Sequence, residues 1–220
     1  MTQASFIRWV LKPVIWVGCL VPAGILVVRA VRGDLTANPI ELLTNWTGYT
    51  TLVLLVVTLA VTPIRRITRW NGVIKVRRLI GLFAFFYATI HFSIYIGLDQ
   101  FFGWSFIVED IIERPYITVG FSAFLLLIPL ALTSTRGAIR RLGRRWQLLH
   151  RLIYVSASLG VLHYYWKVKA DTREPLIFAA ILVVLFAIRI VHRALAARTR
   201  LRAKGRSTPA IPQNDLAPAD

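Results

Sequence analysis

The sequence is almost free of sulfur. It contains one cysteine, Cys19, and one methionine, Met1, among 220 residues. A single cysteine excludes a disulfide framework within the chain and excludes a thiolate cluster that would bind zinc or an iron–sulfur centre. The scarcity of methionine also counts against a copper site built from thioether ligands. The chain therefore has too few sulfur ligands to bind a soft metal ion.

Acidic residues are also few, with 10 Asp and Glu against 27 Lys and Arg and a formal net charge of +17. In a soluble protein such an excess would suggest a nucleic-acid partner. However, 56% of the residues are hydrophobic, far more than in a soluble domain of this size. We therefore expect an integral membrane protein with no nucleic-acid partner. No glycine-rich phosphate loop or nucleotide-binding fingerprint is present.

The apolar residues fall into segments long enough to cross a hydrocarbon core of about 30 Å. These segments cover residues 10–28, 48–64, 79–98, 117–132, 148–166 and 176–191. The pattern predicts an all-α fold, in which residues 10–193 form a six-transmembrane-helix bundle. Residues 1–9 would be a short N-terminal segment, and residues 194–220 a basic, disordered tail. No internal repeat is evident from the sequence.

The distribution of charge predicts the orientation of the bundle. Arginine and lysine gather between the second and third segments, between the fourth and fifth, and after the sixth. Acidic residues before the tail lie in the other loops. Because basic loops stay in the cytoplasm, we expect both termini to be cytoplasmic. The basic loops are also expected to contact anionic lipid headgroups.

Three of the four histidines lie in apolar segments. His91 and His163 belong to the third and fifth segments, which run in the same direction, so both should lie in the outer half of the membrane and could face each other. Two imidazoles from different helices can hold the iron of a haem b for electron transfer. His150 is thirteen residues before His163 on the predicted fifth helix, or about 20 Å along its axis, which places it near the inner face.

A haem at His150 would need a second ligand. Fourteen residues before His91, nearly four helical turns and so close to the same face, stands Arg77, which is a poor ligand for iron. His192 lies at the same depth, where its basic surroundings are typical of a side chain that reaches toward the interface. The residues thus allow one haem or two. A proton relay is the competing use of these histidines, although no carboxylate lies within the segments to join it.

Several motifs together resemble one known family. The stretches RRLIGLFAFFYATIHFSIY, RPYITVG, PLALTST and LGRRWQLLHRLIYVSASLGVLHYYW are similar to the MsrQ family, within the ferric reductase-like transmembrane superfamily. The resemblance covers roughly residues 8–195. It implies a haem b subunit of the bacterial inner membrane, with FMN as a further cofactor. Such a subunit would pass electrons from a quinol or flavin donor to MsrP, a periplasmic molybdenum enzyme that repairs methionine sulfoxide in oxidised proteins.

The same resemblance implies roles for individual residues. His91, His150 and His163 match the family's histidines and are candidate axial ligands of haem iron. Arg77 stands where related NADPH oxidases have the inner histidine, so it becomes a candidate contact for a haem propionate or a flavin phosphate. Sulfoxide reduction would take place in the partner, and no catalytic residue is assigned to this chain.

Two other functions stay open at this point. A stand-alone transmembrane ferric or cupric reductase would favour acidic or methionine ligands in the outer loops. A proton-coupled permease without a cofactor predicts discontinuous helices and polar groups near the membrane midplane, and the segments offer few such groups besides the histidines. A haem absorbance band in the purified protein would exclude the permease.

Overall fold

The computed structural model describes residues 2–206, with side chains up to Thr199, and all regular structure in this range is helical. The longer helices are α2 Lys12–Val31, α3 Pro39–Thr68, α4 Arg77–Ile94, α6 Pro115–Leu132, α9 Leu152–Lys167 and α10 Arg173–Arg206. The shorter elements are α1 Gln3–Phe6, η1 Ile7–Leu11, η2 Asn71–Lys75, η3 Tyr95–Asp99, α5 Trp104–Glu113, α7 Arg136–Leu142 and α8 Arg144–Leu149. The predicted all-α membrane protein is thus confirmed.

Five helical segments of the described chain are long and apolar enough to cross a membrane. They are Gln3–Val31, Pro39–Thr68, Arg77–Asp99, Pro115–Leu132 and Arg173–Thr199. The predicted segment 148–166 does not form one helix, because α8 ends at Leu149 and α9 starts at Leu152. With 16 residues, α9 is about 24 Å long, which is shorter than the hydrocarbon core.

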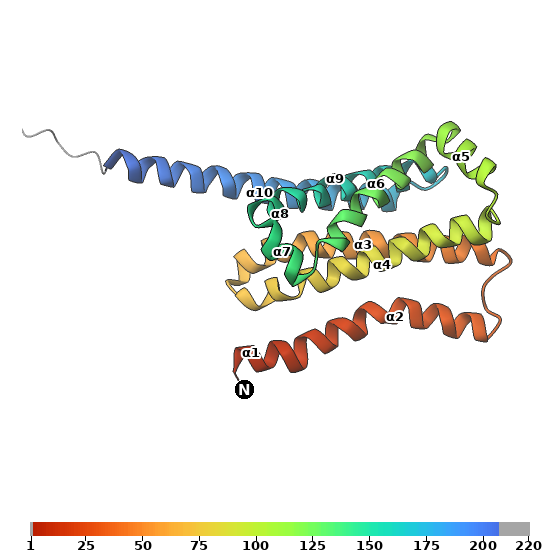
Figure 1. Cartoon of the computed structure of the whole chain (residues 1–220), viewed down its shortest axis with the longest axis horizontal. Coiled ribbons are helices and arrows are strands. Elements are labelled where there is room, and N and C mark those ends of the chain that lie inside the picture. The colour runs from red at the N-terminus through yellow and green to blue at the C-terminus, as the bar shows by residue number, and fades with distance from the viewer. Residues whose placement is uncertain (1, 207–220) are drawn as a thin grey trace, which may run out of the picture.

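The helices lie side by side (Figure 1). The connections at the two ends of the bundle differ in charge. We call the end with the α3–α4 turn, α7 and α8 the basic end, since these connections are rich in arginine. We call the other end the acidic end, because it carries the acidic residues Asp34, Glu41, Asp99, Glu109, Asp110, Glu113, Asp171 and Glu174. Helix α10 continues beyond residue 193 to Arg206, and residues 207–220 of the expected tail lie outside the described residues.

Two close helix pairs, α3 with α4 and α6 with α9, form the centre of the bundle, and α10 packs against α9 and α3. Small side chains allow the close approach: Ala84 of α4 and Ala157 of α9 are fully buried. The hydroxyl of Ser156, also fully buried, donates a hydrogen bond to the carbonyl of Ala123 at 3.0 Å. This bond ties α9 to α6 inside the apolar core.

Helix α2 is attached to the bundle near Pro22, which lies inside the helix. The hydroxyl of Tyr87 accepts a hydrogen bond from the Ala23 amide at 3.0 Å and donates one to the Cys19 carbonyl at 2.7 Å. The side chain is therefore inserted between two groups of α2 that are four residues apart. Trp46 adds a bond from its indole nitrogen to the Pro22 carbonyl at 3.1 Å.

Candidate functional site

A cavity of about 1150 Å³ opens between the two helix pairs at the acidic end. Ligand sites in proteins usually measure about 300–1,000 Å³, so this cavity has room for a large cofactor. Most of its deeper wall is apolar and aromatic, and His91 and His163 both line it. Apolar walls with a few polar groups are typical of cofactor sites.

The imidazoles of His91 and His163 are neighbours in this cavity. Their ring centres are 6.1 Å apart, and their planes make an angle of 82°. Bonds between a metal ion and an imidazole nitrogen are about 2 Å long, so a single ion between two imidazoles separates the ring centres by about 6 Å. The observed separation suits one metal centre between the two side chains.

Each imidazole is oriented by a backbone carbonyl of the neighbouring helix. The Nδ1 atom of His91 lies 2.9 Å from the carbonyl oxygen of Thr44 in α3. The Nδ1 atom of His163 lies 2.7 Å from the carbonyl oxygen of Tyr116 in α6. Because a carbonyl can only accept, both Nδ1 atoms carry the proton. The two Nε2 atoms are then left with free lone pairs, as a metal-binding histidine requires.

A glycine makes room for each ring. A Cβ added at Gly48 would be 3.0 Å from both Nδ1 and Cε1 of His91. At Gly120 the added carbon would be 2.5 Å from Nδ1 and 2.8 Å from Cε1 of His163, closer than any real contact. A side chain at either position would therefore press against the imidazole, and at Gly120 it would have to displace it.

The two halves of the site are built in the same way. In each half the carbonyl that orients the histidine lies 47 residues earlier in the chain. Each glycine follows that carbonyl by four residues, or one helical turn. The structure thus shows a local repeat that the sequence did not suggest. The repeat was hard to see because it consists only of two glycines, two histidines and two backbone carbonyls, and the residues that supply these carbonyls have different side chains.

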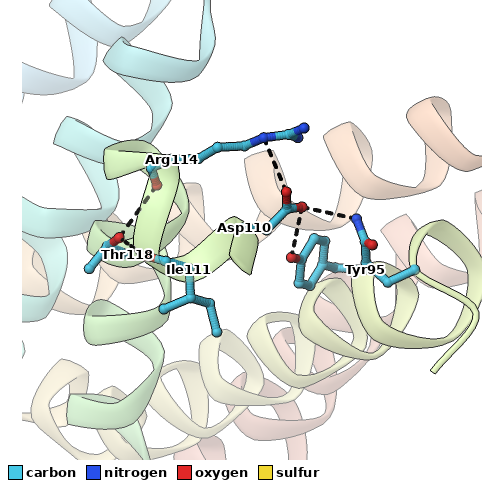
Figure 2. A network of polar contacts seen from close by, with 6 residues as sticks. Tyr95, Asp110, Ile111, Arg114 and Thr118 are labelled. Atoms are coloured by element: carbon cyan, nitrogen blue, oxygen red, sulfur yellow. Dashed lines mark hydrogen bonds and ion pairs between the residues drawn. The ribbon is translucent and has the colours of Figure 1, made fainter. Parts of the chain in front are cut away.

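A polar network joins the elements at the rim of the cavity (Figure 2). The carboxylate of Asp110 in α5 accepts hydrogen bonds from the Tyr95 hydroxyl at 3.1 Å and the Gln100 amide at 3.0 Å, and it pairs with Arg114 at 3.1 Å. The pKa of the Arg114 guanidinium is raised by contact with the Tyr116 side chain and by the Asp110 carboxylate, so it stays charged. The network holds α5 against η3 and the start of α6.

A second cation at this cavity is Lys167. It follows His163 by one helical turn and lines the same cavity. Its ammonium group donates a hydrogen bond to the side-chain oxygen of Asn45 in α3. Together with Arg114 and Lys169, Lys167 offsets part of the negative charge of the carboxylates that also line the cavity.

His150 lies elsewhere, at the basic end. Its ring stacks on Trp146 with centres 3.9 Å apart, and its Nδ1 atom is 3.1 Å from the Trp146 carbonyl, which also accepts from the His150 amide. The prediction that His150 and His163 share one continuous helix was wrong, because a turn at His150 and Arg151 ends α8 before α9 begins. The Nε2 atom of His150 is buried and has no hydrogen-bond partner among the described residues.

Arg77 and His192 were the other candidates at this end. Arg77 is the first residue of α4, is half-buried, and lies close enough for its charge to act on His150. His192 is exposed on α10 and does not line the cavity. The structure therefore brings His91 to His163, leaves Arg77 within range for its charge to act on His150, and leaves His192 outside the cavity.

Comparisons with known proteins identify the family. A family model described as ferric reductase like transmembrane component matches residues 43–161, more than half of the chain. A relative from Herminiimonas arsenicoxydans is 50% identical over 82% of this chain and 84% of its own length. A relative from Rhodospirillum rubrum is 55% identical over 80% and 86%, respectively. Both are named protein-methionine-sulfoxide reductase heme-binding subunit MsrQ. The chain belongs to the MsrQ family.

Membership of the MsrQ family confirms the resemblance predicted from the motifs. A third relative with the same name, from Ralstonia nicotianae, is 51% identical over 80% of this chain and 82% of its own length. No solved structure matches the chain. The carbonyls of Thr44 and Tyr116 and the two glycines were not among the residues selected from the sequence. The signal that could have found them is the equal spacing of each glycine from the histidine that follows it.

Proposed function

We propose that this chain is the haem b electron-transfer subunit of a methionine sulfoxide reductase system in the bacterial inner membrane. The observation that carries the proposal is the pair formed by His91 and His163, with ring centres 6.1 Å apart in a cavity of about 1150 Å³. The names of the relatives, which state a heme-binding subunit of this reductase, support the cofactor and the system.

The residues of the cavity fit haem b. Haem iron held by two imidazoles supplies one-electron transfer rather than oxygen chemistry. His91 and His163 would bind it through their free Nε2 atoms, and the apolar walls would exclude water from its faces. The carbonyls of Thr44 and Tyr116 fix both tautomers and make the imidazoles stronger electron donors to a metal. Arg114 and Lys167 at the rim suit the carboxylates of a haem edge.

The orientation follows from the charges of the connections. We propose six spans, with α9 as the fifth, because α9 packs along α6 and continues the polypeptide that begins with α8. Both termini and the basic end would then face the cytoplasm. The acidic end and its cavity would face the periplasm, where the partner MsrP, a molybdenum enzyme, would receive electrons. Sulfoxide reduction would occur in that partner.

Electrons would enter at the basic end, from the quinone pool or from a flavin donor. His150 is the candidate ligand for a second haem there, because its Nε2 atom is buried and has no partner among the described residues. Arg77 lies close to it and could contact a haem propionate or the phosphate of FMN. One haem at the acidic end is the minimum that the proposal requires.

A reoxidation experiment tests this function. The purified chain is reduced under anaerobic conditions, and the haem absorbance is followed after addition of purified MsrP with methionine sulfoxide. We expect rapid reoxidation that needs both additions. Reoxidation by ferric citrate alone, with no response to MsrP and sulfoxide, would instead show a stand-alone ferric reductase. MsrP without sulfoxide is the control for non-specific oxidation.

A further inference from the structure

Arg189 is a buried arginine within the apolar part of α10. Its side chain is only 6% exposed, although it lies in a helical segment long and apolar enough to cross a membrane. It donates a hydrogen bond from Nη2 to the carbonyl of Leu59 in α3. That carbonyl is available because the residue one turn later is Pro63, which has no N–H to offer it. Arg189 thus satisfies a backbone group that a proline leaves open.

The rest of the guanidinium is not neutralised. Its Nη1 atom is buried and has no hydrogen-bond partner among residues 2–199, and the ion pairs found in that range do not include Arg189. The ring of Tyr154 lies 5.0 Å from the guanidinium carbon, which offers only a partial compensation. A buried charge without a partner costs several kcal/mol, on the order of the penalty for an ion at membrane depth.

The charged neighbours of Arg189 increase this imbalance. Arg77, Arg66 and Arg193 are near enough for their positive charges to act on it. Arg77 also acts on His150, and Tyr154, whose ring packs against Arg189, follows His150 by four residues. The two buried nitrogen atoms without partners in the described chain, Nη1 of Arg189 and Nε2 of His150, are therefore both at the basic end. The clustered arginines, with an open N–H donor on Arg189, favour an anion. The Nε2 atom of His150 carries a lone pair, because its Nδ1–H faces the Trp146 carbonyl, and it suits a metal ion instead.

We propose that Arg189, together with Arg77, forms a binding site for one oxyanion, a carboxylate or a phosphate group, at the basic end of the bundle. Planar guanidinium groups are well matched to both. The group would come either from a propionate of a haem bound at His150 or from the headgroup phosphate of an anionic phospholipid. The propionate source rests on the proposed function, whereas the phospholipid source does not.

The test separates the charge of Arg189 from its structural bond. In the double variant Pro63→Ala/Arg189→Met, the new amide at position 63 can take over the bond to the Leu59 carbonyl, so only the charge is lost. Pro63→Ala alone is the matched control, because it keeps the arginine. Arg173→Met removes an exposed charge at the acidic end and controls for net charge. All proteins are the full chain with its haem, in nanodiscs of phosphatidylcholine or of phosphatidylcholine mixed with phosphatidylglycerol.

Two readouts distinguish the sources. If a headgroup phosphate occupies the site, phosphatidylglycerol raises the thermal unfolding midpoint of the wild type and of both controls, and the double variant loses this rise. If a propionate occupies it, the midpoint potential of a haem falls in the double variant in both lipids, because removal of a positive charge destabilises the reduced form. The controls then keep the wild-type potential.

The proposal is overturned if the double variant keeps both the response to phosphatidylglycerol and the wild-type potential. A folded wild-type protein without haem would contradict the proposed function. The response of its thermal unfolding midpoint to phosphatidylglycerol would still decide whether a phospholipid headgroup occupies the site. If the double variant does not fold, Arg189→Lys in the Pro63→Ala background replaces it. That variant keeps one charge but loses the planar fork, so we expect a reduced response, and an unchanged one counts against the site.

Discussion

The histidines at the two ends of the bundle have different surroundings. At the acidic end, His91 and His163 come from different helix pairs, and each has a carbonyl that orients it and a glycine that makes room for it. At the basic end, His150 lies in a turn, stacked on Trp146, with arginine as its charged neighbour. A pair of imidazoles at one depth therefore needs a carbonyl and a glycine from a neighbouring helix beside each ring. The basic end has the features of a site for negative charge.

Removal of either paired imidazole should have the largest effect on the protein. His91→Ala and His163→Ala should each abolish the low-spin haem spectrum of the acidic end, since one imidazole cannot hold the iron from both faces. Absorbance and electron paramagnetic resonance spectra of the purified variants measure this.

Two control variants belong to this prediction. His192→Ala should leave haem content unchanged, because His192 is exposed on α10. His150→Ala should keep the signal of the acidic-end pair. A full bis-imidazole signal in both the His91 and His163 variants would show that the ligands are elsewhere.

The glycines provide a finer test of the same end. Gly120→Ala should displace the His163 ring, because the added carbon would lie 2.5 Å from Nδ1. We expect strong loss of haem per chain, measured by the pyridine haemochrome assay. Gly48→Ala should have a smaller effect, since its closest distance is 3.0 Å. Gly24→Ala is the control, because nothing lies within 4 Å of a Cβ there. Equal haem content in all three variants would mean that the glycines do not position the ligands.

Much of the fold could be predicted from the sequence, because apolar length and loop charge report directly on membrane helices. His91 and His163 could be predicted to lie at the same depth, because they belong to two segments that run in the same direction. The break at His150 was missed, because it lies in the backbone bonding, where the amides of Arg151 and Tyr154 bond to carbonyls three residues earlier, beside the stacking of His150 on Trp146. Apolar periodicity records neither effect.

The carbonyl partners of the histidines could not be predicted from residue patterns. Any residue supplies a carbonyl, so Thr44 and Tyr116 carry no side-chain signature for this role. Arg189 was missed for another reason. It stands beside a basic helix end, and only the packing of α10 against α3 shows that it is buried.

The rim network around Asp110 should contribute to the stability of the acidic end. Asp110→Asn removes the charge that Tyr95, Gln100 and Arg114 share. Hydrogen bonds to a charged group contribute about 1.5–3 kcal/mol, so we expect a lower thermal unfolding midpoint and a loosened α5. Asp171→Asn, whose pair with Arg173 is exposed, should change little. An unchanged midpoint in Asp110→Asn would show that the network does not hold α5.

The smallest expected effect lies outside both ends. Tyr87→Phe removes the hydroxyl inserted into α2 and should lower stability by about 1 kcal/mol, with the haem spectrum unchanged. Thermal unfolding in detergent, followed with the absorbance spectrum, measures both. Tyr165→Phe, at an exposed position, is the control. Residues Cys19 and Pro22 of α2 line the cavity, so an altered spectrum in Tyr87→Phe would mean that this attachment of α2 shapes the haem site.

The most direct measurement for the paired-histidine site is a reduced-minus-oxidised absorbance spectrum of the purified chain, with haem counted per chain. We predict a low-spin b-type spectrum and at least one haem per chain, and a second haem would assign His150 as a ligand. A chain that folds but contains no haem, after expression with sufficient haem supply, would contradict the electron-transfer function. That result would favour a permease without a cofactor.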